Sequence, residues 1–244
     1  MSKLRNKIHD LENWKAIEQY LPGDRSSHTT IEDYIENICE QLKGPIKLLD
    51  LGCGRGDSID FFKEISSDIN WHGVDIEDSP EVKTRVRESE SILAFDGVNL
   101  PYEDNEFDLI YCNQVLEHVR YPDQLASSAY RVLKPGGLFI GSVSYLEPFH
   151  SYSIFNFTPY GTATVFTDAG FKIEELRPGV DSFSLISRQL VNRSNLFKPL
   201  WSINAMHMGV NLLGFLSGLN HREKNFLKTQ FAGQIVFTAK ASKD

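Results

Sequence analysis

Short apolar runs and longer amphipathic segments alternate through the middle of the chain. The runs lack the in-and-out alternation of a half-exposed strand, so each is expected to form a strand buried on both faces. They cover residues 46–51, 71–76, 92–95, 107–112 and 138–143. Helices are expected between them, most clearly over residues 57–66 and 122–133. Strands separated by helices predict an α/β fold with a mainly parallel sheet.

The flanking segments follow other patterns. Residues 3–20 and a segment that begins at Thr30 carry apolar residues at helical spacing, and Gly44-Pro45 ends the second helix. Downstream, the sequence predicts a helix over 158–170, strands over 171–176, 182–186 and 234–240, and an apolar segment over 200–219. No internal repeat or linker interrupts the chain, so one domain is expected.

The amino-acid composition and the net charge argue against several classes of function. Lys and Arg together number 25 against 33 Asp and Glu, which gives a formal net charge of -8. A general nucleic-acid binder is disfavoured, because neutralising phosphates needs concentrated basic residues. Cys39, Cys53 and Cys112 form no Cys-x-x-Cys pair, so neither a zinc site nor a disulfide framework is expected, and a reducing, cytoplasmic location fits best. No cluster of metal ligands, no secretory signal and no run of roughly 20 apolar residues for a stable membrane span is apparent.

The glycine-dense turn after the first predicted strand is the main ligand-binding candidate. It forms the stretch Asp50-Leu51-Gly52-Cys53-Gly54-Arg55-Gly56-Asp57. Glycines allow backbone N–H groups to approach a ligand closely, and the following helix adds its N-terminus. Asp57 occupies the third-glycine position of the dinucleotide fingerprint, and no Gly-Lys-Ser/Thr follows. Asp50 would repel phosphates and attract a cationic ligand, so a nicotinamide cofactor is disfavoured.

Further acidic residues follow the next two predicted strands. Asp75 ends the second strand, where a carboxylate can accept hydrogen bonds from two ribose hydroxyls. Asp96, before Gly97, could accept a hydrogen bond from the exocyclic amine of adenine, or it could cap a turn. Asn113 and Gln114 follow the fourth strand.

Together these motifs resemble class I S-adenosylmethionine (SAM)-dependent methyltransferases of the small-molecule "type 11" branch. The resemblance covers about residues 45–145 and rests on 48–56, 73–76, 96–108, 113–118 and 131–137, in the right order. It implies a Rossmann-like, doubly wound, seven-stranded sheet, mostly parallel with an antiparallel last strand and helices on both faces. The expected parts are an N-terminal helical lid (1–44), a SAM-binding core (45–186), a helical insertion (187–231) and the last strand (232–244).

The resemblance also implies how SAM is held and released as S-adenosylhomocysteine. Asp50, Gly52 and Gly54 would hold the methionine half, with Cys53 as a small buried filler of the loop. Asp75 would grip the ribose and Ile76 would pack on adenine. The remaining cofactor candidates are Asp96 and Gly97 beside adenine and Asn113 and Gln114 beside the transferable methyl. An acidic, glycine-lined pocket suits SAM, which carries an ammonium and a sulfonium but no phosphate.

Acceptor specificity is expected after the fifth strand, over residues 145–160. His150 is the candidate general base, because imidazole titrates near neutrality; ordering of the loop is the alternative. Tyr145, Glu147 and Tyr152 are possible acceptor contacts. The stretch around Pro148-Phe149-His150 is loosely similar to methyltransferases of cell-surface glycan assembly, although Asn156 replaces an arginine common there. That similarity implies a small-molecule acceptor with a hydroxyl, such as a sugar, a glycan precursor or a lipid-linked sugar.

Several alternatives remain. N- or C-methylation of another metabolite, or a non-catalytic SAM-binding protein, would use the same cofactor motifs. His118 is expected to pack within a helix. The apolar segment 200–219 is expected to be a packing helix or a substrate lid, with transient membrane contact if the acceptor is lipid-linked, because it lacks the polar face of an interfacial helix.

Overall fold

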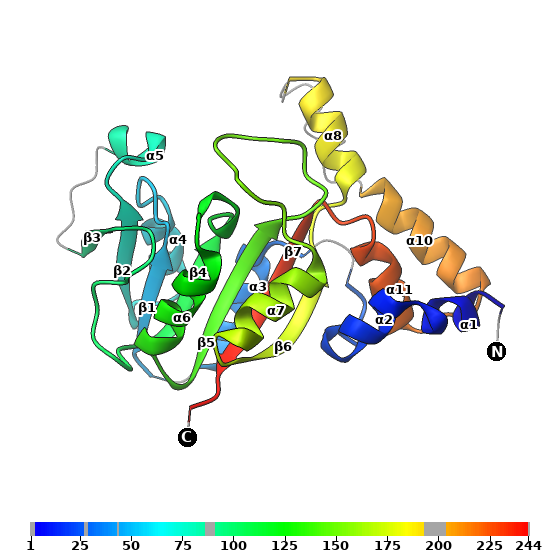
Figure 1. Cartoon of the computed structure of the whole chain (residues 1–244), viewed down its shortest axis with the longest axis horizontal. Coiled ribbons are helices and arrows are strands. Elements are labelled where there is room, and N and C mark those ends of the chain that lie inside the picture. The colour runs from blue at the N-terminus through cyan, green and yellow to red at the C-terminus, as the bar shows by residue number, and fades with distance from the viewer. Residues whose placement is uncertain (1–2, 27–28, 43, 86–90, 193–203, 244) are drawn as a thin grey trace.

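The computed structural model describes residues 3–26, 29–42, 44–85, 91–192 and 204–243. Within these ranges seven strands form one sheet in the order β3-β2-β1-β4-β5-β7-β6 (Figure 1). The strands are β1 (Ile46–Leu51), β2 (Ile69–Ile76), β3 (Ile92–Phe95), β4 (Phe107–Asn113), β5 (Leu133–Ser144), β6 (Phe171–Pro178) and β7 (Gln234–Ala241). Neighbours from β3 to β5 run parallel, whereas β7 is antiparallel to both β5 and β6. The predicted doubly wound fold with an antiparallel last strand is confirmed.

Helices cover both faces of this sheet (Figure 1). In the described residues they are α1 (Lys3–Asp10), α2 (Glu12–Ile17), α3 (Ile31–Gln41), α4 (Ser58–Ile65), α5 (Pro80–Lys83), α6 (Pro122–Val132), α7 (Pro159–Asp168), α8 (Ser182–Leu190), α10 (Ala205–Leu216), α11 (His221–Thr229) and the 3-10 helices η1 (Glu18–Tyr20) and η2 (Leu116–His118). Adjacent strand residues enter different cores: Leu48 and Leu109 pack with α3 and α4, and Leu49 and Ile110 pack with α6 and α7. All four are fully buried, which explains the unalternated apolar runs of the sequence.

Residues 182–186, predicted as a strand piece, instead begin helix α8. The Asp181 side chain accepts a hydrogen bond from the Ser184 backbone N–H at 2.8 Å and so caps the helix. The prediction was wrong because a short apolar stretch does not distinguish a strand from a buried helix face. Helix α8 therefore joins the predicted insertion, which lies between β6 and β7.

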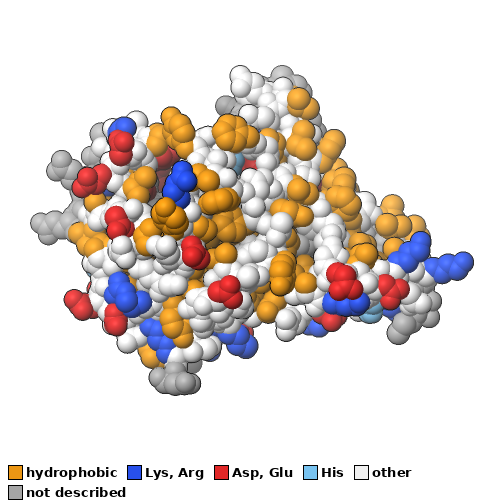
Figure 2. All heavy atoms as spheres, in the orientation of Figure 1, with side chains coloured by type: hydrophobic (Ala, Val, Ile, Leu, Met, Phe, Trp, Pro, Cys, Tyr) orange, Lys and Arg blue, Asp and Glu red, His pale blue; other side chains and the backbone are white. Residues whose placement is uncertain are grey.

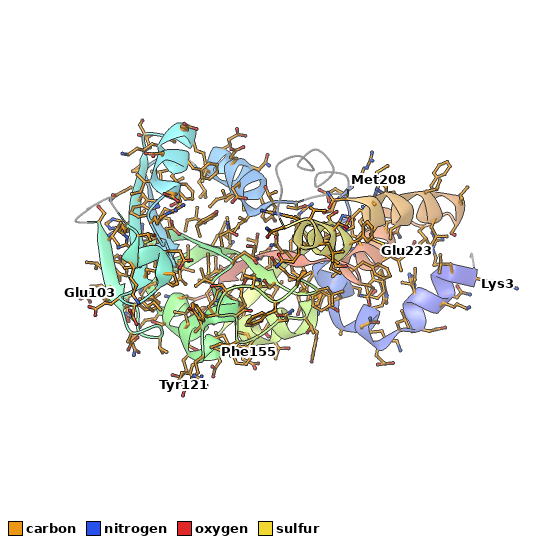
Figure 3. The ribbon with its side chains drawn as sticks, turned by 90° about the horizontal axis from the view of Figure 1, so that it is seen from above. Lys3, Glu103, Tyr121, Phe155, Met208 and Glu223 are labelled. Atoms are coloured by element: carbon orange, nitrogen blue, oxygen red, sulfur yellow. The ribbon has the colours of Figure 1, made fainter. Side chains whose placement is uncertain are left out.

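Helices α1 and α2 lie at the opposite side of the molecule from β1, β2 and the loops that follow them (Figures 1 and 3). Arg5 on α1 donates a hydrogen bond to Glu223 on α11, with Nε 2.7 Å from Oε1. Trp14 on α2 meets the ring of Phe226 on α11 edge-on, with centroids 5.2 Å apart. This position differs from the lid predicted for residues 1–44, because the apolar face of α2 is buried against α11 and α7. Within that segment, α3 is the helix that reaches the predicted cofactor edge.

The apolar segment 200–219 is described from Asn204 onward, where α10 packs between α8 and α11. His207 and Val210 are buried, whereas Met208, Leu212 and Phe215 are each more than 60% exposed. Figure 2 shows apolar side chains along the slope that α8 and α10 form. In the described part of the chain, no helix combines the length and the apolar character needed to cross a bilayer.

Candidate active site

The glycine turn lies at the carboxyl ends of β1, β2 and β4, which are neighbours in the sheet. The Gly52 N–H donates a hydrogen bond to the Val74 carbonyl at 2.8 Å, so the turn is tied to β2. Gly52 has a φ of +77°, and a Cβ at this position would lie 2.4 Å from Val115 Cγ2. Only glycine fits a left-handed backbone this close to the segment after β4.

Asp50 lies beneath this turn and is 3% exposed. It accepts a hydrogen bond from the Ser58 hydroxyl on α4, and the Trp71 indole donates to the same hydroxyl at 3.1 Å. Burial raises the pKa of the Asp50 carboxyl to about 7. A cation bound beside Asp50 would favour the ionised carboxylate, so this position suits a positively charged ligand.

Asp75 ends β2 and faces the turn. Its Oδ2 accepts the Gly54 N–H at 2.6 Å, and its Oδ1 accepts the Ile76 N–H at 2.7 Å. Burial raises the pKa of Asp75, and these two hydrogen bonds oppose that shift. Each carboxylate oxygen keeps a further lone pair, so Asp75 can still accept hydrogen bonds from two ligand hydroxyls.

Arg85 was not singled out from the sequence, yet its guanidinium donates to the Gly54 carbonyl, with Nε 2.8 Å from the oxygen. Its charge lies close to Cys53, whose Sγ is 3.9 Å from Nη2. Burial raises the pKa of the Cys53 thiol, which agrees with the predicted role of a buried filler. The spacing of the motifs in the sequence does not indicate Arg85, which follows the short helix α5.

The Asp96 carboxylate accepts hydrogen bonds from residues of its own turn. Its Oδ1 accepts the Val98 and Asn99 N–H groups at 2.8 and 2.6 Å, and its Oδ2 accepts Asn99 Nδ2 at 2.7 Å. The Asn99 hydrogen bonds lower the pKa of Asp96. Asp96 therefore caps its own turn, and because Oδ2 keeps a further lone pair, its contact with an adenine amine stays a prediction. The exposed Ile76 side chain lies beside Gly97, whose Cβ position is 3.6 Å from Ile76 Cγ2, so an open apolar platform remains there.

Asn113 and Gln114 lie at the carboxyl end of β4, between β1 and β5. Asn113 Nδ2 donates to Glu32 Oε1 on α3 at 3.1 Å, and Asn113 Oδ1 accepts the Ser142 hydroxyl at 2.6 Å. The Gln114 side-chain amide lies 3.1 Å from the same hydroxyl. Asn113 thus joins α3 and β5 at the cofactor edge, and Glu32 is a member of this edge that the sequence did not indicate.

A second polar cluster lies beside these residues, after β4 and β5. The Ser144 hydroxyl is 3.0 Å from Glu117 Oε1 and 2.9 Å from Glu147 Oε2. His150 Nδ1 is 3.7 Å from Glu147 Oε1, and the His118 and His150 rings meet edge-on with centroids 5.6 Å apart. Burial raises the pKa of the Glu117 carboxyl. His118 therefore lies in a polar cluster with His150 rather than in an apolar packing position, and Glu117 was missed from the sequence.

This cluster borders the predicted acceptor region. A hollow of about 210 Å³ is lined by Glu147 and Pro148 from the loop after β5 and by Leu185, Arg188 and Gln189 from α8. Helix α8 therefore forms one wall of the space beside Glu147. Its outward residues Phe183, Ile186 and Leu190 are exposed apolar side chains.

Comparisons with known proteins concern the domain that carries this site. Residues 49–141 match the family model of a methyltransferase domain. The ubiquinone biosynthesis O-methyltransferase of Pseudomonas aeruginosa is 29% identical over 105 residues, which cover 40% of this chain and 44% of that protein. The demethylmenaquinone methyltransferase of Staphylococcus saprophyticus is 38% identical over 106 residues, or 41% of this chain and 45% of that protein. The chain thus matches less than half the length of either relative.

A solved structure supports the same fold. The phosphoethanolamine N-methyltransferase 2 of Haemonchus contortus, in complex with SAM, superposes with a TM-score of 0.55 at 20% identity, over 86% of this chain and 51% of that one. At this identity the likeness concerns the fold alone. Residues 49–141 thus match a methyltransferase domain in sequence, and the chain shares the fold of this SAM-bound methyltransferase.

Proposed function

We propose that the chain is an enzyme that transfers a methyl group from SAM to a hydroxyl of a small-molecule acceptor. The observation that carries this proposal is the pair of carboxylates, Asp50 and Asp75, that flank the glycine turn at one edge of the sheet. Asp50 would repel a phosphate-bearing dinucleotide and attract a cationic nucleoside, and Asp75 would hold the ribose.

The residues present fit SAM in three respects. Asp50, buried and with a pKa raised to about 7, would gain a positive neighbour from the ammonium of the ligand. Asp75 keeps acceptor capacity for ribose hydroxyls, and the exposed Ile76 beside Gly97 offers a face for adenine. Bound SAM supplies a methyl group on a sulfonium, which is already activated for displacement. The protein then has to hold the acceptor oxygen in line and remove its proton.

His150 is the residue proposed to act on that proton. It lies on the loop after β5, half-buried, with Glu147 3.7 Å from Nδ1 to orient the ring. The hollow beside Glu147 gives an acceptor a place to lie against α8. Its mixed lining, with Arg188, Gln189 and Leu185, suits a polar group on a partly apolar molecule. Sugars and glycan precursors, including lipid-linked ones, are the proposed class, and the names of the matched relatives add quinone precursors.

Calorimetric titration with SAM tests the cofactor part. Wild type should bind one equivalent, Asp75→Ala should bind much more weakly, and Asp78→Ala serves as the matched control. Asp78 is three residues away, is highly exposed and forms an ion pair with Lys83. Equal SAM affinity in all three proteins would contradict the proposed site.

Turnover tests the acceptor part. Release of S-adenosylhomocysteine is measured with a panel of sugars, glycan precursors and phenolic quinone precursors, each with its hydroxyl free or already methylated. Turnover that requires the free hydroxyl supports O-methylation. Methylation of amine or carbon acceptors alone would replace the O-directed proposal, and SAM binding without turnover on any acceptor would favour a binding protein.

A further inference from the structure

Two loops that are distant in sequence bring three metal-type ligands together. Glu117 and His118 lie on η2 after β4, and His150 lies on the loop after β5. One side-chain ligand atom from each lies within 4.8 Å of the other two. The Glu117 carbonyl accepts the Ile154 N–H at 2.7 Å and the Phe155 N–H at 3.1 Å, which fixes the second loop against the first. Figure 3 shows Phe155 on this loop.

The Glu117 carboxylate is incompletely satisfied. Its side chain is fully buried, and one oxygen lies 3.0 Å from the Ser144 hydroxyl. Its other oxygen, Oε2, has no hydrogen-bond partner among the described residues. A buried carboxylate oxygen without a donor is costly, and a bound cation is one way to satisfy it. The unpartnered oxygen is therefore a second, independent sign that the Glu117 carboxylate binds a ligand.

We propose that Glu117, His118 and His150 bind one divalent transition-metal ion. Two imidazoles and one carboxylate form a donor set that suits zinc, iron or manganese, whereas magnesium and calcium prefer oxygen ligands throughout. Glu147 adds negative charge beside the site, because its Oε1 lies 3.7 Å from His150 Nδ1. Three protein ligands leave coordination positions open, as in metal sites that bind a substrate.

The open coordination position would allow the ion to bind the methyl acceptor. This role of the ion rests on the function proposed above. An acceptor hydroxyl bound there would lose its proton more easily, because the cation withdraws charge from the oxygen. The hydroxyl proton would pass to solvent, the oxygen would form the new bond to the methyl carbon of SAM, and the carbon–sulfur bond would break with its electron pair left on sulfur. His150 then acts on the proton through the ion, because a nitrogen that binds a metal cannot also accept a proton.

The experiment uses tag-free full-length protein, stripped with a chelator and titrated separately with Zn²⁺ by calorimetry and with Mn²⁺ by electron paramagnetic resonance. Wild type should bind one equivalent of at least one of these ions. Glu117→Gln, His118→Ala and His150→Ala should each weaken binding by about tenfold or more, the scale on which even outer partners of metal sites act. His221→Gln, a change at an exposed histidine on α11, should leave affinity unchanged.

SAM binding and circular dichroism are measured on the same proteins. Unchanged spectra show that lost metal affinity is not unfolding, and Glu117→Gln keeps the shape of the buried side chain if the alanine variants fold poorly. The absence of saturable binding of either ion, or equal affinity in the three ligand variants and wild type, overturns the metal site. Metal binding that survives while SAM binding fails overturns the proposed function alone.

Discussion

Asp50→Asn should separate the stability of the fold from its capacity to bind a cation. Asp50 is fully enclosed, and burial raises its pKa from 3.8 to about 7. A carboxyl whose pKa is higher in the folded than in the unfolded state stabilises the fold at low pH. That stabilisation is lost as the pH rises through the folded value, because the folded state must then hold a buried charge. Asparagine has nearly the same shape and no charge to bury.

The size of the effect follows from the shift. A shift of one pKa unit changes the free energy by somewhat more than 1 kcal/mol, so wild type should lose on the order of 1–2 kcal/mol of unfolding free energy between pH 6 and pH 8.5 relative to the Asn variant. Other titrating groups occur in both proteins and cancel in the difference. Working above pH 6 also avoids the sequence pI of about 5.4, where low net charge promotes precipitation.

Urea unfolding at several pH values measures the difference, and SAM titration at pH 8.5 measures the functional consequence. The Asn variant should gain stability relative to wild type as the pH rises, yet bind SAM about tenfold more weakly or worse, because a charge-assisted interaction is lost. A stability difference that stays constant from pH 6 to 8.5 would refute the assignment of the raised pKa to Asp50. Unchanged SAM affinity would refute its contact with the cation.

Three further perturbations test other parts of the molecule. Gly52→Ala should lower SAM affinity at least tenfold in calorimetry and cost about 1–2 kcal/mol of stability in urea unfolding. The reason is that a Cβ at this positive φ would lie 2.4 Å from Val115 Cγ2. Wild-type SAM affinity in this variant would contradict the close approach of the turn to the ligand. Phe226→Ala should cost about 3–5 kcal/mol in urea unfolding, because this fully buried ring packs against Trp14. The same change should expose α1 and α2 to limited proteolysis. A loss of stability below about 1 kcal/mol would show that other contacts hold the N-terminal helices. Asp181→Ala should cost about 1 kcal/mol through the lost cap of Ser184, whereas Asp168→Ala, an exposed position on α7, should cost almost nothing in the same urea experiment.

The central sheet could be predicted because both of its faces are buried. Five apolar runs predicted β1 to β5 within a few residues, although β5 begins earlier than the run 138–143 suggested. Pairs such as Leu48 and Leu49 enter opposite cores, so neighbouring positions along these strands can both be apolar. The cofactor edge was also predictable, because residues at the carboxyl ends of adjacent parallel strands meet at one edge of the sheet.

The rest depended on contacts that periodicity does not contain. Helix α8 is capped by Asp181, and an apolar stretch of five residues did not reveal that. The position of α1 and α2 depends on Trp14 meeting Phe226, more than two hundred residues away in sequence. The grouping of Glu117, His118 and His150 likewise requires two loops to be folded against each other.

The place of β7 in the sheet has a consequence for how the protein is made. It is the last described strand to leave the ribosome, yet it lies between β5 and β6 rather than at an edge. Until residues 234–241 emerge, β5 and β6 each present an unpaired row of backbone hydrogen-bonding groups, which invites association with other chains. The helical segment between β6 and β7 is synthesised in this interval and prolongs it. The sheet can therefore be completed only once residues 234–241 have emerged, and crowding on polysomes before that point should favour aggregation through these two edges.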